Sequence, residues 1–269
     1  MKGNNPSFLA SFSFMSILTL ISRILGYVRD LFFAFILGAT PVADSFLLAF
    51  RIPNFFRRLF AEGAINNAFI PLYLSISSKK NSIEAKKFSG SLFLLLILGL
   101  ILILIIGELF MLEIVNFLAP NFSTVMQIKT ANLASIMFPY LIFISASSFI
   151  GAILNANNRF LMWAFLPIIL NFFMVVGMVF SFKNLLDVGT ILSYSVTLAG
   201  LVQFFTILFW SRYLKITFIF TKPRLSKEIK KFLKLLFPNL LAGGVVQINQ
   251  FIGIFFASSI PGAISWLYY

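Results

Sequence analysis

The sequence predicts an all-α, polytopic membrane protein with seven long helices and the start of an eighth. Of its 269 residues, 60% are hydrophobic and only 11% are charged, which is a far more apolar composition than that of a soluble domain. Apolar runs long enough to cross a bilayer recur along the whole chain. Lysine and arginine collect in alternate connections between these runs, as they do when loops lie alternately on the two sides of a membrane.

The apolar runs give the expected helices in order. Their ranges are about 7–38, 42–77, 88–118, 130–156, 160–182, 189–212 and 229–257, and an eighth helix opens near Gly262. The first run is too long and too often interrupted by arginine to be a cleaved signal peptide, so it is expected to stay in the membrane. The second run is unusually long, and Pro53 and Pro71 are expected to bend it.

The positive charges predict the orientation of the chain. The N-terminal leader and the second-to-third, fourth-to-fifth and sixth-to-seventh connections together hold fourteen lysines and arginines, whereas the opposite connections hold only Lys129 and Lys183. Loops rich in lysine and arginine lie on the cytoplasmic side. The N-terminus is therefore expected to be cytoplasmic.

The connection before the seventh helix is the longest, and it ends in an amphipathic pattern. Its apolar positions are Ile229, Phe232, Leu233 and Leu236, with lysines between them. Such a segment is typical of a helix that lies on the inner leaflet. We therefore expect a six-helix N-terminal lobe over 1–212, a cytoplasmic amphipathic linker over 213–231 and the start of a second lobe over 232–269.

The composition also excludes several classes of function. A net charge of +13 could indicate nucleic-acid binding, but in a membrane chain a basic excess usually reflects cytoplasmic loops and anionic lipid, so no nucleic-acid partner is expected. The absence of cysteine removes disulfides and thiolate catalysis, and the absence of histidine removes the commonest metal ligand and general base. No P-loop motif occurs. Neither a metal nor a cofactor is expected.

Eight charged residues lie within the first two helices, in sequence that is otherwise apolar enough for a bilayer. They are Arg23, Arg29, Asp30, Asp44, Arg51, Arg57, Arg58 and Glu62. A single arginine at mid-membrane costs roughly 3 kcal/mol on insertion scales. Five of them would not persist there unless water, a partner charge or a ligand met them.

Helical geometry places most of these charges on two polar stripes. At about 100° per residue, Arg23, Arg29 and Asp30 share one arc of the first helix, while apolar residues occupy the remainder. On the second helix, spacings of seven, seven and four give a single stripe of Asp44, Arg51, Arg58 and Glu62. The two stripes are expected to face each other across a water-filled space.

The five arginines exceed the three carboxylates by two charges, so this space is expected to attract an anion. Arginine presents a planar fork that binds phosphate or carboxylate through two hydrogen bonds, and it stays protonated in any pocket. A phosphate-bearing substrate therefore fits best. Two interpretations of the carboxylates stay open: they exchange arginine partners as a switch, or they form static bridges between helices.

A membrane enzyme acting on polyprenyl phosphates is the alternative from a different class. In that case Asp30 and Glu62 would form an acid/base pair. Such enzymes usually carry their catalytic groups on sizeable loops, whereas the outer connections here span only a few to about a dozen residues. Transport is the preferred interpretation.

The seventh helix carries polar amides within its apolar run. They are Asn239, Gln247, Asn249 and Gln250. Amides in lipid either join helices through hydrogen bonds or line a cavity, and the sequence leaves both interpretations open.

Several strings of residues closely resemble the lipid II flippase MurJ family, formerly MviN, of the multidrug/oligosaccharidyl-lipid/polysaccharide exporter superfamily. The strings are Ser22–Asp30, Ala43–Phe46 and Pro53–Ala64, with further matches at Phe138–Tyr140, Gly151–Phe160, Pro167 with Asn171, and Ser265–Tyr269. The resemblance spans nearly the whole chain.

This resemblance implies a two-lobe exporter fold in which two six-helix lobes enclose a cationic cavity and two further helices form a lipid-facing groove. It implies a transporter and not an enzyme. The substrate would be lipid II, an undecaprenyl-pyrophosphate-linked disaccharide peptide, carried by alternating access from the inner to the outer leaflet of the bacterial inner membrane for cell-wall synthesis. Lipid II and membrane lipids are the implied partners, and an exporter of another polyprenyl-linked glycan is the alternative.

The resemblance also implies roles for individual residues. The positions that match diphosphate-binding arginines of the family are Arg23, Arg29 and Arg57. The positions that match gating pairs or a family acidic residue are Asp30, Asp44, Arg58 and Glu62. Arg51 stands where the family also accepts lysine.

The family continues beyond the position of Tyr269 into a second lobe. The sequence is therefore expected to be an incomplete copy: either a fragment or truncated product, or a chain whose C-terminal lobe comes from a partner. One lobe cannot enclose a cavity or rock against a counterpart, so the chain by itself is not expected to transport.

Overall fold

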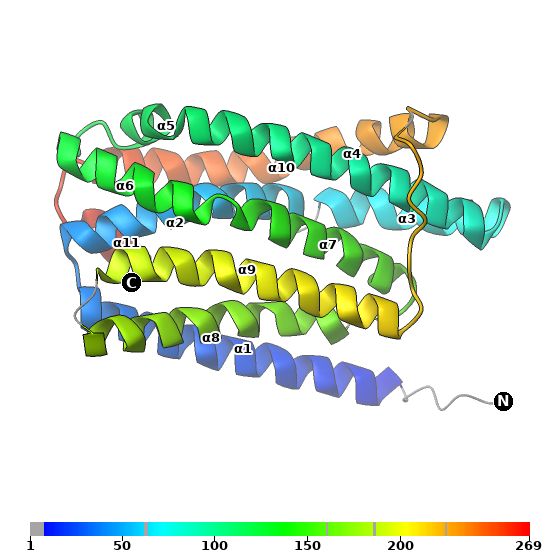
Figure 1. The fold of residues 1–269 in the computed structure, drawn as a ribbon, viewed down its shortest axis with the longest axis horizontal. Coiled ribbons are helices and arrows are strands. Elements are labelled where there is room, and N and C mark those ends of the chain that lie inside the picture. Colours follow the sequence, from blue (N-terminus) through cyan, green and yellow to red (C-terminus); the bar gives the residue numbers. More distant parts are fainter. Residues whose placement is uncertain (1–7, 62–63, 160, 185–186, 224) are drawn as a thin grey trace.

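The computed structural model describes residues 8–61, 64–159, 161–184, 187–223 and 225–269, and the regular structure in these ranges is helical. The helices run roughly side by side along the long axis of the molecule (Figure 1). In chain order they are α1 (Phe8–Leu37), α2 (Pro41–Ala61), α3 (Ala64–Lys79), α4 (Ser82–Leu109), α5 (Met111–Leu118), α6 (Thr124–Met137), α7 (Tyr140–Ala156), α8 (Leu161–Asn184), α9 (Val188–Tyr213), α10 (Lys227–Ala257) and α11 (Ala263–Tyr268).

Each expected helix has a counterpart among these elements, so the all-α prediction is confirmed. Three expected helices are each divided into two elements. The second helix becomes α2 and α3, the third becomes α4 and α5, and the fourth becomes α6 and α7. The division of the third lies at Phe110, and that of the fourth lies at Phe138 and Pro139.

The starts of α4 and α6 are set by polar caps, which the apolar pattern did not detect. These helices begin at Ser82 and Thr124, whereas the apolar runs predicted starts near 88 and 130. At α4, the Asn81 side chain accepts a hydrogen bond from the backbone N–H of Glu84 at 2.8 Å. A cap of this kind satisfies one of the free N–H groups of the first turn, so a helix extends back to it.

Five segments of the described chain are long and apolar enough to cross a membrane. They are Ser82–Leu109, Thr124–Ala156, Ala164–Phe182, Val188–Tyr213 and Lys227–Ala257. In α4, Leu98, Leu102 and Ile105 each expose about half or more of their surface. Exposed leucine and isoleucine along a helix of this length are the surface that a bilayer requires.

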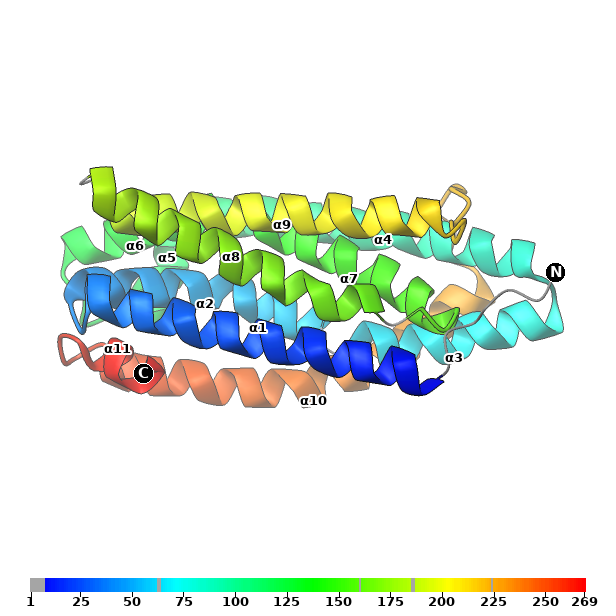
Figure 2. The ribbon, with the colours of Figure 1, turned by 90° about the horizontal axis from the view of Figure 1, so that it is seen from below.

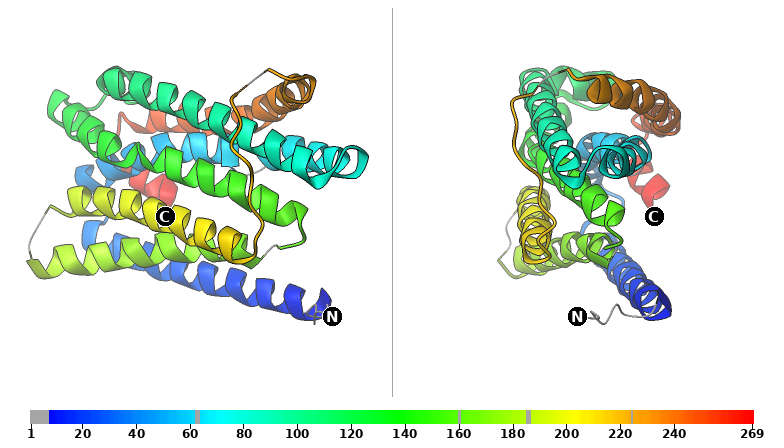
Figure 3. Two further views of the ribbon diagram at one scale, coloured as in Figure 1. Left: turned by 45° about the vertical axis from the view of Figure 1, so that its right-hand side comes forward. Right: turned by 90° about the vertical axis from the view of Figure 1, so that its right-hand side faces the viewer.

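The helices form an arc around α2. In the end-on view of Figure 3, α1 and α10 lie at opposite ends of this arc, with α2 and α11 between them. In the view of Figure 2, α8 and α9 lie to one side of α1 and α2, and α10 and α11 lie to the other. The contacts follow this order, since α1 packs on α8, α8 on α9 and α9 on α7.

α2 is an enclosed helix that packs on α6, α7 and α10. Phe46, Leu47, Leu48 and Ala49 are at most 1% exposed. The ring of Phe46 lies 5.5 Å from that of Phe33 in α1, within the range of favourable aromatic pairs. Protein thus surrounds the first half of α2, whereas Arg51 and Arg57 in its second half are partly buried and Arg58 is exposed.

The connection from α9 to α10 crosses α4 in an extended form. The backbone N–H of Ile219 donates to the Lys86 carbonyl at 3.1 Å, and Thr221 Oγ1 donates to that of Lys87 at 3.2 Å. A Cβ at Gly90 would lie 1.9 Å from the Ile219 carbonyl oxygen. Only glycine lets the crossing segment lie this close to α4.

The amphipathic pattern expected within 213–231 and just beyond it belongs to α10. This helix begins at Lys227 and continues without a break to Ala257. Ile229 and Phe232 are buried in an apolar cluster with residues of α3, α4 and α7. This part of the apolar face therefore packs on protein, while Leu233 stays 45% exposed.

Asp187 fastens the start of α9 to α6. Its carboxylate accepts hydrogen bonds from the Thr190 backbone N–H at 3.0 Å and from Lys129 Nζ at 3.1 Å. Burial would raise the pKa of Asp187, but the hydrogen bonds from Thr190 and Lys129 outweigh it, so the pKa lies below its ordinary value of 3.8. The carboxylate therefore stabilises the fold above that pH and loses this effect as the pH falls through the lowered pKa.

Replacing Asp187 with alanine is expected to lower the melting temperature by about 2–4 °C at pH 7, because an N-cap contributes about 1 kcal/mol and a chain of this size responds on that scale. Asp187→Asn keeps the cap and is expected to lose less. The difference between the wild type and the alanine variant should shrink as the pH falls below 3.8. Thermal unfolding in detergent measures these values, and equal melting temperatures at pH 7 would contradict the capping role.

Candidate functional site

A cavity of about 610 Å³ opens where α2, α10 and α11 meet. Arginines from α1 and α2 line one part of it, and α10 supplies amides and an aromatic ring. Its lining residues are Arg29, Phe50, Arg51, Asn54, Phe55, Arg57, Arg58, Leu170, Gln247, Gln250, Phe251, Gly253, Leu267 and Tyr268. Four of these described residues are cationic and none is acidic, so the cavity is suited to an anion.

The arginines of α2 are held to different degrees. Arg57 Nε donates to Asn54 Oδ1 at 2.8 Å, one turn earlier on the same helix. Arg58 Nη1 donates to Gln250 Oε1 of α10 at 3.1 Å. Within the described chain, Arg51 has no hydrogen bond or ion pair. The α2 side of the cavity thus retains donors that a bound anion can use.

Arg29 lies at the centre of a polar network that joins α1, α8 and α11. Its Nη2 lies 2.7 Å from Asp30 Oδ1 and 3.1 Å from the Tyr268 hydroxyl, and its Nη1 donates to Asn171 Oδ1 at 3.0 Å. The Tyr268 hydroxyl in turn donates to Asp30 Oδ1 at 3.1 Å. Asn171 is buried and donates to the Ser22 carbonyl at 3.1 Å. The guanidinium is therefore fixed in direction and mostly satisfied by protein.

Arg23 does not line this cavity. It lies six residues before Arg29 on α1, roughly 9 Å along the helix at 1.5 Å per residue, and its side chain is exposed. The diphosphate-binding role that the resemblance implies for Arg23 stays a prediction.

Asp44 lies away from the water-filled space in which the stripe of α2 was expected to place it. Its side chain belongs to the buried polar set, at 1% exposure. Oδ2 accepts a hydrogen bond from the Gly262 N–H at 2.6 Å, and Oδ1 accepts two from Ser265, from N–H at 2.8 Å and from Oγ at 2.6 Å. The helical-stripe argument could not anticipate this burial, because it depends on α11 folding back over the start of α2.

The other predicted gating residues are Asp30, Arg58 and Glu62, and the structure describes the first two. Asp30 pairs with Arg29, and Arg58 reaches α10 through Gln250. Glu62 lies outside the described residues. The gating roles of these residues remain predictions.

Two of the four amides of α10 line the cavity, and one of these, Gln250, also joins α10 to α2 through Arg58. Gln247 and Gln250 line the cavity. Asn239 donates to the Leu235 carbonyl of its own helix at 2.8 Å, and Asn249 is exposed and absent from the lining. The spacing of three between Gln247 and Gln250 places both on one helix face, and that spacing was the signal available in the sequence.

Three polar contributors were not identified from the sequence as functional. Asn54 holds Arg57, while Asn171 and Tyr268 hold Arg29. The three-residue spacing of Asn54 and Arg57 on one helix could have indicated the first contact. The other two join helices distant in sequence, and no local pattern predicts them.

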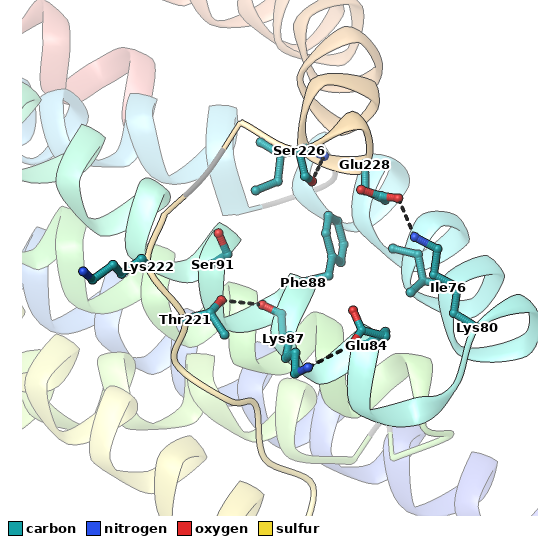
Figure 4. A pocket seen from close by; sticks show the side chains of 11 residues that line it. Ile76, Lys80, Glu84, Lys87, Phe88, Ser91, Thr221, Lys222, Ser226 and Glu228 are labelled. Carbon is teal, nitrogen blue, oxygen red and sulfur yellow. Dashed lines mark hydrogen bonds and ion pairs between the residues drawn. The ribbon is translucent and has the colours of Figure 1, made fainter.

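A second cavity of about 500 Å³ lies at the other end of the bundle, between α3, α4 and the start of α10 (Figure 4). Lys80, the residue after the end of α3, pairs with Glu228 of α10 at 2.9 Å, and Lys87 pairs with Glu84 within α4 at 2.9 Å. These pairs neutralise four of the five charged residues in its described lining. The arrangement fastens α10 to α3, and it offers far less surplus charge than the arginine cavity.

The described residues contain no cluster of three histidine, cysteine, aspartate or glutamate side chains that could hold a metal ion. The site combines helices long enough to cross a membrane with an arginine-lined cavity. This combination is typical of polytopic membrane proteins whose cavities accommodate anions.

Comparison with known proteins identifies the family within this class. The family model described as lipid II flippase MurJ matches residues 33–269. The chain therefore belongs to the lipid II flippase MurJ family, a family of transporters and not of enzymes, and the resemblance found in the sequence is confirmed.

Individual relatives agree with this assignment. The chain is 39% identical over 257 residues to the probable lipid II flippase MurJ of Rhizobium meliloti (strain 1021), covering 93% of this chain and 48% of that protein. It is 37% identical over 259 residues to that of Rickettsia prowazekii (strain Madrid E), covering 95% and 50%. A solved structure, lipid II flippase MurJ in an inward closed conformation, superposes with a TM-score of 0.79 and 31% identity, covering 94% of this chain and 52% of that one.

The chain spans about half the length of the relatives that it matches. It is a multi-pass membrane protein that corresponds to the N-terminal part of the family fold.

Proposed function

We propose that the chain forms the N-terminal part of a lipid II flippase in the bacterial inner membrane. In this function the protein carries an undecaprenyl-pyrophosphate-linked disaccharide peptide from the inner to the outer leaflet by alternating access. The observation that carries the proposal is the cavity with four arginines and no carboxylate in its described lining. A diphosphate bears the charge that such a lining neutralises.

The residues of this chain have distinct parts in the proposal. Arg57 and Arg51 meet the diphosphate from α2, where their guanidinium groups line the cavity. Arg29 joins them when it exchanges protein partners for the substrate. The isoprenoid tail stays in lipid, while the charged head crosses through the cavity.

Asp30 and Tyr268 compete with the substrate for Arg29. In the described state both hold the guanidinium. Substrate phosphate oxygens can replace these acceptors, which would release Asp30 and loosen α11 from α1. This exchange of ion pairs is the switch we propose between the two accessible states. Arg58 and Glu62 would act as a second gating pair, and Arg23 would meet the diphosphate before or after the cavity.

An orientation with the cytoplasmic N-terminus completes the proposal. It places the lysine-rich connections against the anionic inner leaflet, together with Lys80 after α3 and Lys87 in the first turns of α4, both labelled in Figure 4. The complete transporter requires the second lobe that the family relatives possess.

The test is export of lipid II in cells depleted of their own flippase and supplied with the full-length protein. Arg57→Ala is expected to reduce the lipid II that reaches the outer leaflet by about tenfold or more, because a hydrogen bond to a charged group contributes roughly 1.5–3 kcal/mol. Arg57→Lys keeps the charge without the planar fork, so its export is expected to lie between that of the alanine variant and that of the wild type.

Arg212→Ala is the matched control, because Arg212 lies at the end of α9 and outside the arginine cavity. It is expected to export normally. Undiminished export by Arg57→Ala would count against the scheme. If a different lipid-linked glycan accumulates when cells are depleted of the protein, the substrate is that polyprenyl-linked glycan and not lipid II.

A further inference from the structure

We propose that α10 supplies a second, uncharged wall of the cavity, which binds the sugar of the substrate next to its diphosphate. The wall consists of Gln247 and Gln250 with the rings of Phe55 and Phe251. This inference rests on the proposed function and adds to it the residues that select the glycan.

The chemistry of the two walls differs. Arginine only donates hydrogen bonds, which suits phosphate oxygens. A glutamine amide both donates and accepts, and sugar hydroxyl and acetamido groups require both. Gln247 has no hydrogen-bond partner within the described chain, and it is partly exposed to the cavity. Its amide is therefore available to a ligand.

Gln250 can offer the NH₂ group of its amide to a ligand. Its Oε1 accepts a hydrogen bond from Arg58 Nη1 at 3.1 Å. The NH₂ group of the same amide can then donate two hydrogen bonds to a ligand. The bond to Arg58 also orients this amide, so less side-chain entropy is lost when a ligand binds.

The aromatic rings complete the wall with an apolar surface. Phe55 of α2 and Phe251 of α10 have ring centroids 5.3 Å apart, and both line the cavity. A pyranose ring has an apolar face of C–H groups that packs on an aromatic ring, while its hydroxyls point outward to polar partners. Rings beside glutamines form a surface of this mixed character.

The two walls adjoin in the way that the substrate requires. In a diphosphate-linked glycan the first sugar is bonded directly to the phosphate, so the sugar-binding surface must begin where the cationic surface ends. The Arg58–Gln250 hydrogen bond is that junction, because it joins a cation of α2 to an amide of α10. A substrate whose phosphates meet α2 would thus place its first sugar against α10.

The experiment compares two lipids that differ only in the sugar-peptide head. The full-length protein in lipid nanodiscs is titrated with lipid II and with undecaprenyl pyrophosphate. Gln247→Leu is expected to weaken binding of lipid II about tenfold, because one or two hydrogen bonds are lost. Binding of undecaprenyl pyrophosphate is expected to change less than about twofold. Asn249→Leu is the matched control, since Asn249 lies two positions later and does not line the cavity, and it should leave both affinities unchanged.

The results that would refute this inference differ from those that would refute the proposed function. If Gln247→Leu leaves lipid II binding unchanged, or weakens both lipids equally, the sugar-binding wall is refuted. If the wild type binds neither lipid, or Arg57→Ala affects neither, the flippase function itself is refuted. Gln247→Met keeps the length of the side chain without the amide, and it gives the same comparison if the leucine variant fails to fold.

Discussion

Arg29→Ala in the full-length protein is expected to reduce lipid II export by about a hundredfold, which is the largest effect on function expected here and corresponds to roughly 2.7 kcal/mol. The guanidinium contacts Asp30, Asn171 and Tyr268 in addition to lining the cavity. Its loss removes a cavity cation, and among the described residues it leaves the Tyr268 hydroxyl as the hydrogen-bond partner of the Asp30 carboxylate. An uncompensated charge in a half-buried site is costly.

Two further variants separate the charge of Arg29 from its position. Arg29→Lys keeps the charge but cannot contact three partners from one planar group, so export is expected to fall between the alanine variant and the wild type. Asn171→Leu keeps Arg29 and removes the buried amide that holds it from α8. This variant is expected to reduce export about tenfold or less, as for one lost hydrogen bond to a charged group. Normal export by Arg29→Ala would show that the network only fastens helices.

The sequence was sufficient to predict the class, the helices and the cationic character of the site. Arg29, Arg51 and Arg58 could be assigned to polar stripes because helical geometry depends only on spacing. The cost of arginine in a bilayer then required a cavity or a partner. The structure places all three at one cavity, together with Arg57.

The parts that the sequence could not predict depend on contacts between distant segments. Asp44 shares a stripe with Arg51, but α11 covers the start of α2 and buries the Asp44 side chain. Phe232 reads as lipid-facing in an amphipathic pattern, yet it packs on α3 and α4. In both cases the deciding partner lies more than a hundred residues away, so local periodicity cannot distinguish protein from water or lipid.

Asp44→Ala is expected to cause the largest loss of stability among single substitutions of the charged residues. The buried carboxylate accepts three hydrogen bonds, from Gly262 N–H and from Ser265 N–H and Oγ. Gly262 has φ +82, and a Cβ at that position would lie 2.9 Å from the Ala39 carbonyl oxygen. The start of α11 is thus a tight turn that the Asp44 carboxylate anchors to α2.

Removing the carboxylate leaves the buried donors of Gly262 and Ser265 without an acceptor. Each unsatisfied buried donor costs about 1–3 kcal/mol, so a loss of about 3 kcal/mol is expected after relaxation. For a chain of this size, this corresponds to a melting temperature lower by about 6–12 °C. Thermal unfolding in detergent measures the shift, and a shift of less than about 2 °C would contradict the anchoring role.

Asp44→Asn distinguishes an anchor from a gate. Asparagine keeps an oxygen acceptor for Ser265 or Gly262, so it should retain more than half of the stability that the alanine variant loses. If Asp44 is only an anchor for α11, the alanine variant, which loses more stability, should also lose more export than the asparagine variant. The reason is that α11 carries the Tyr268 hydroxyl that contacts Arg29. If Asp44→Asn folds with nearly normal stability and yet fails to export, the charge itself takes part in transport, as the family resemblance implied for this position.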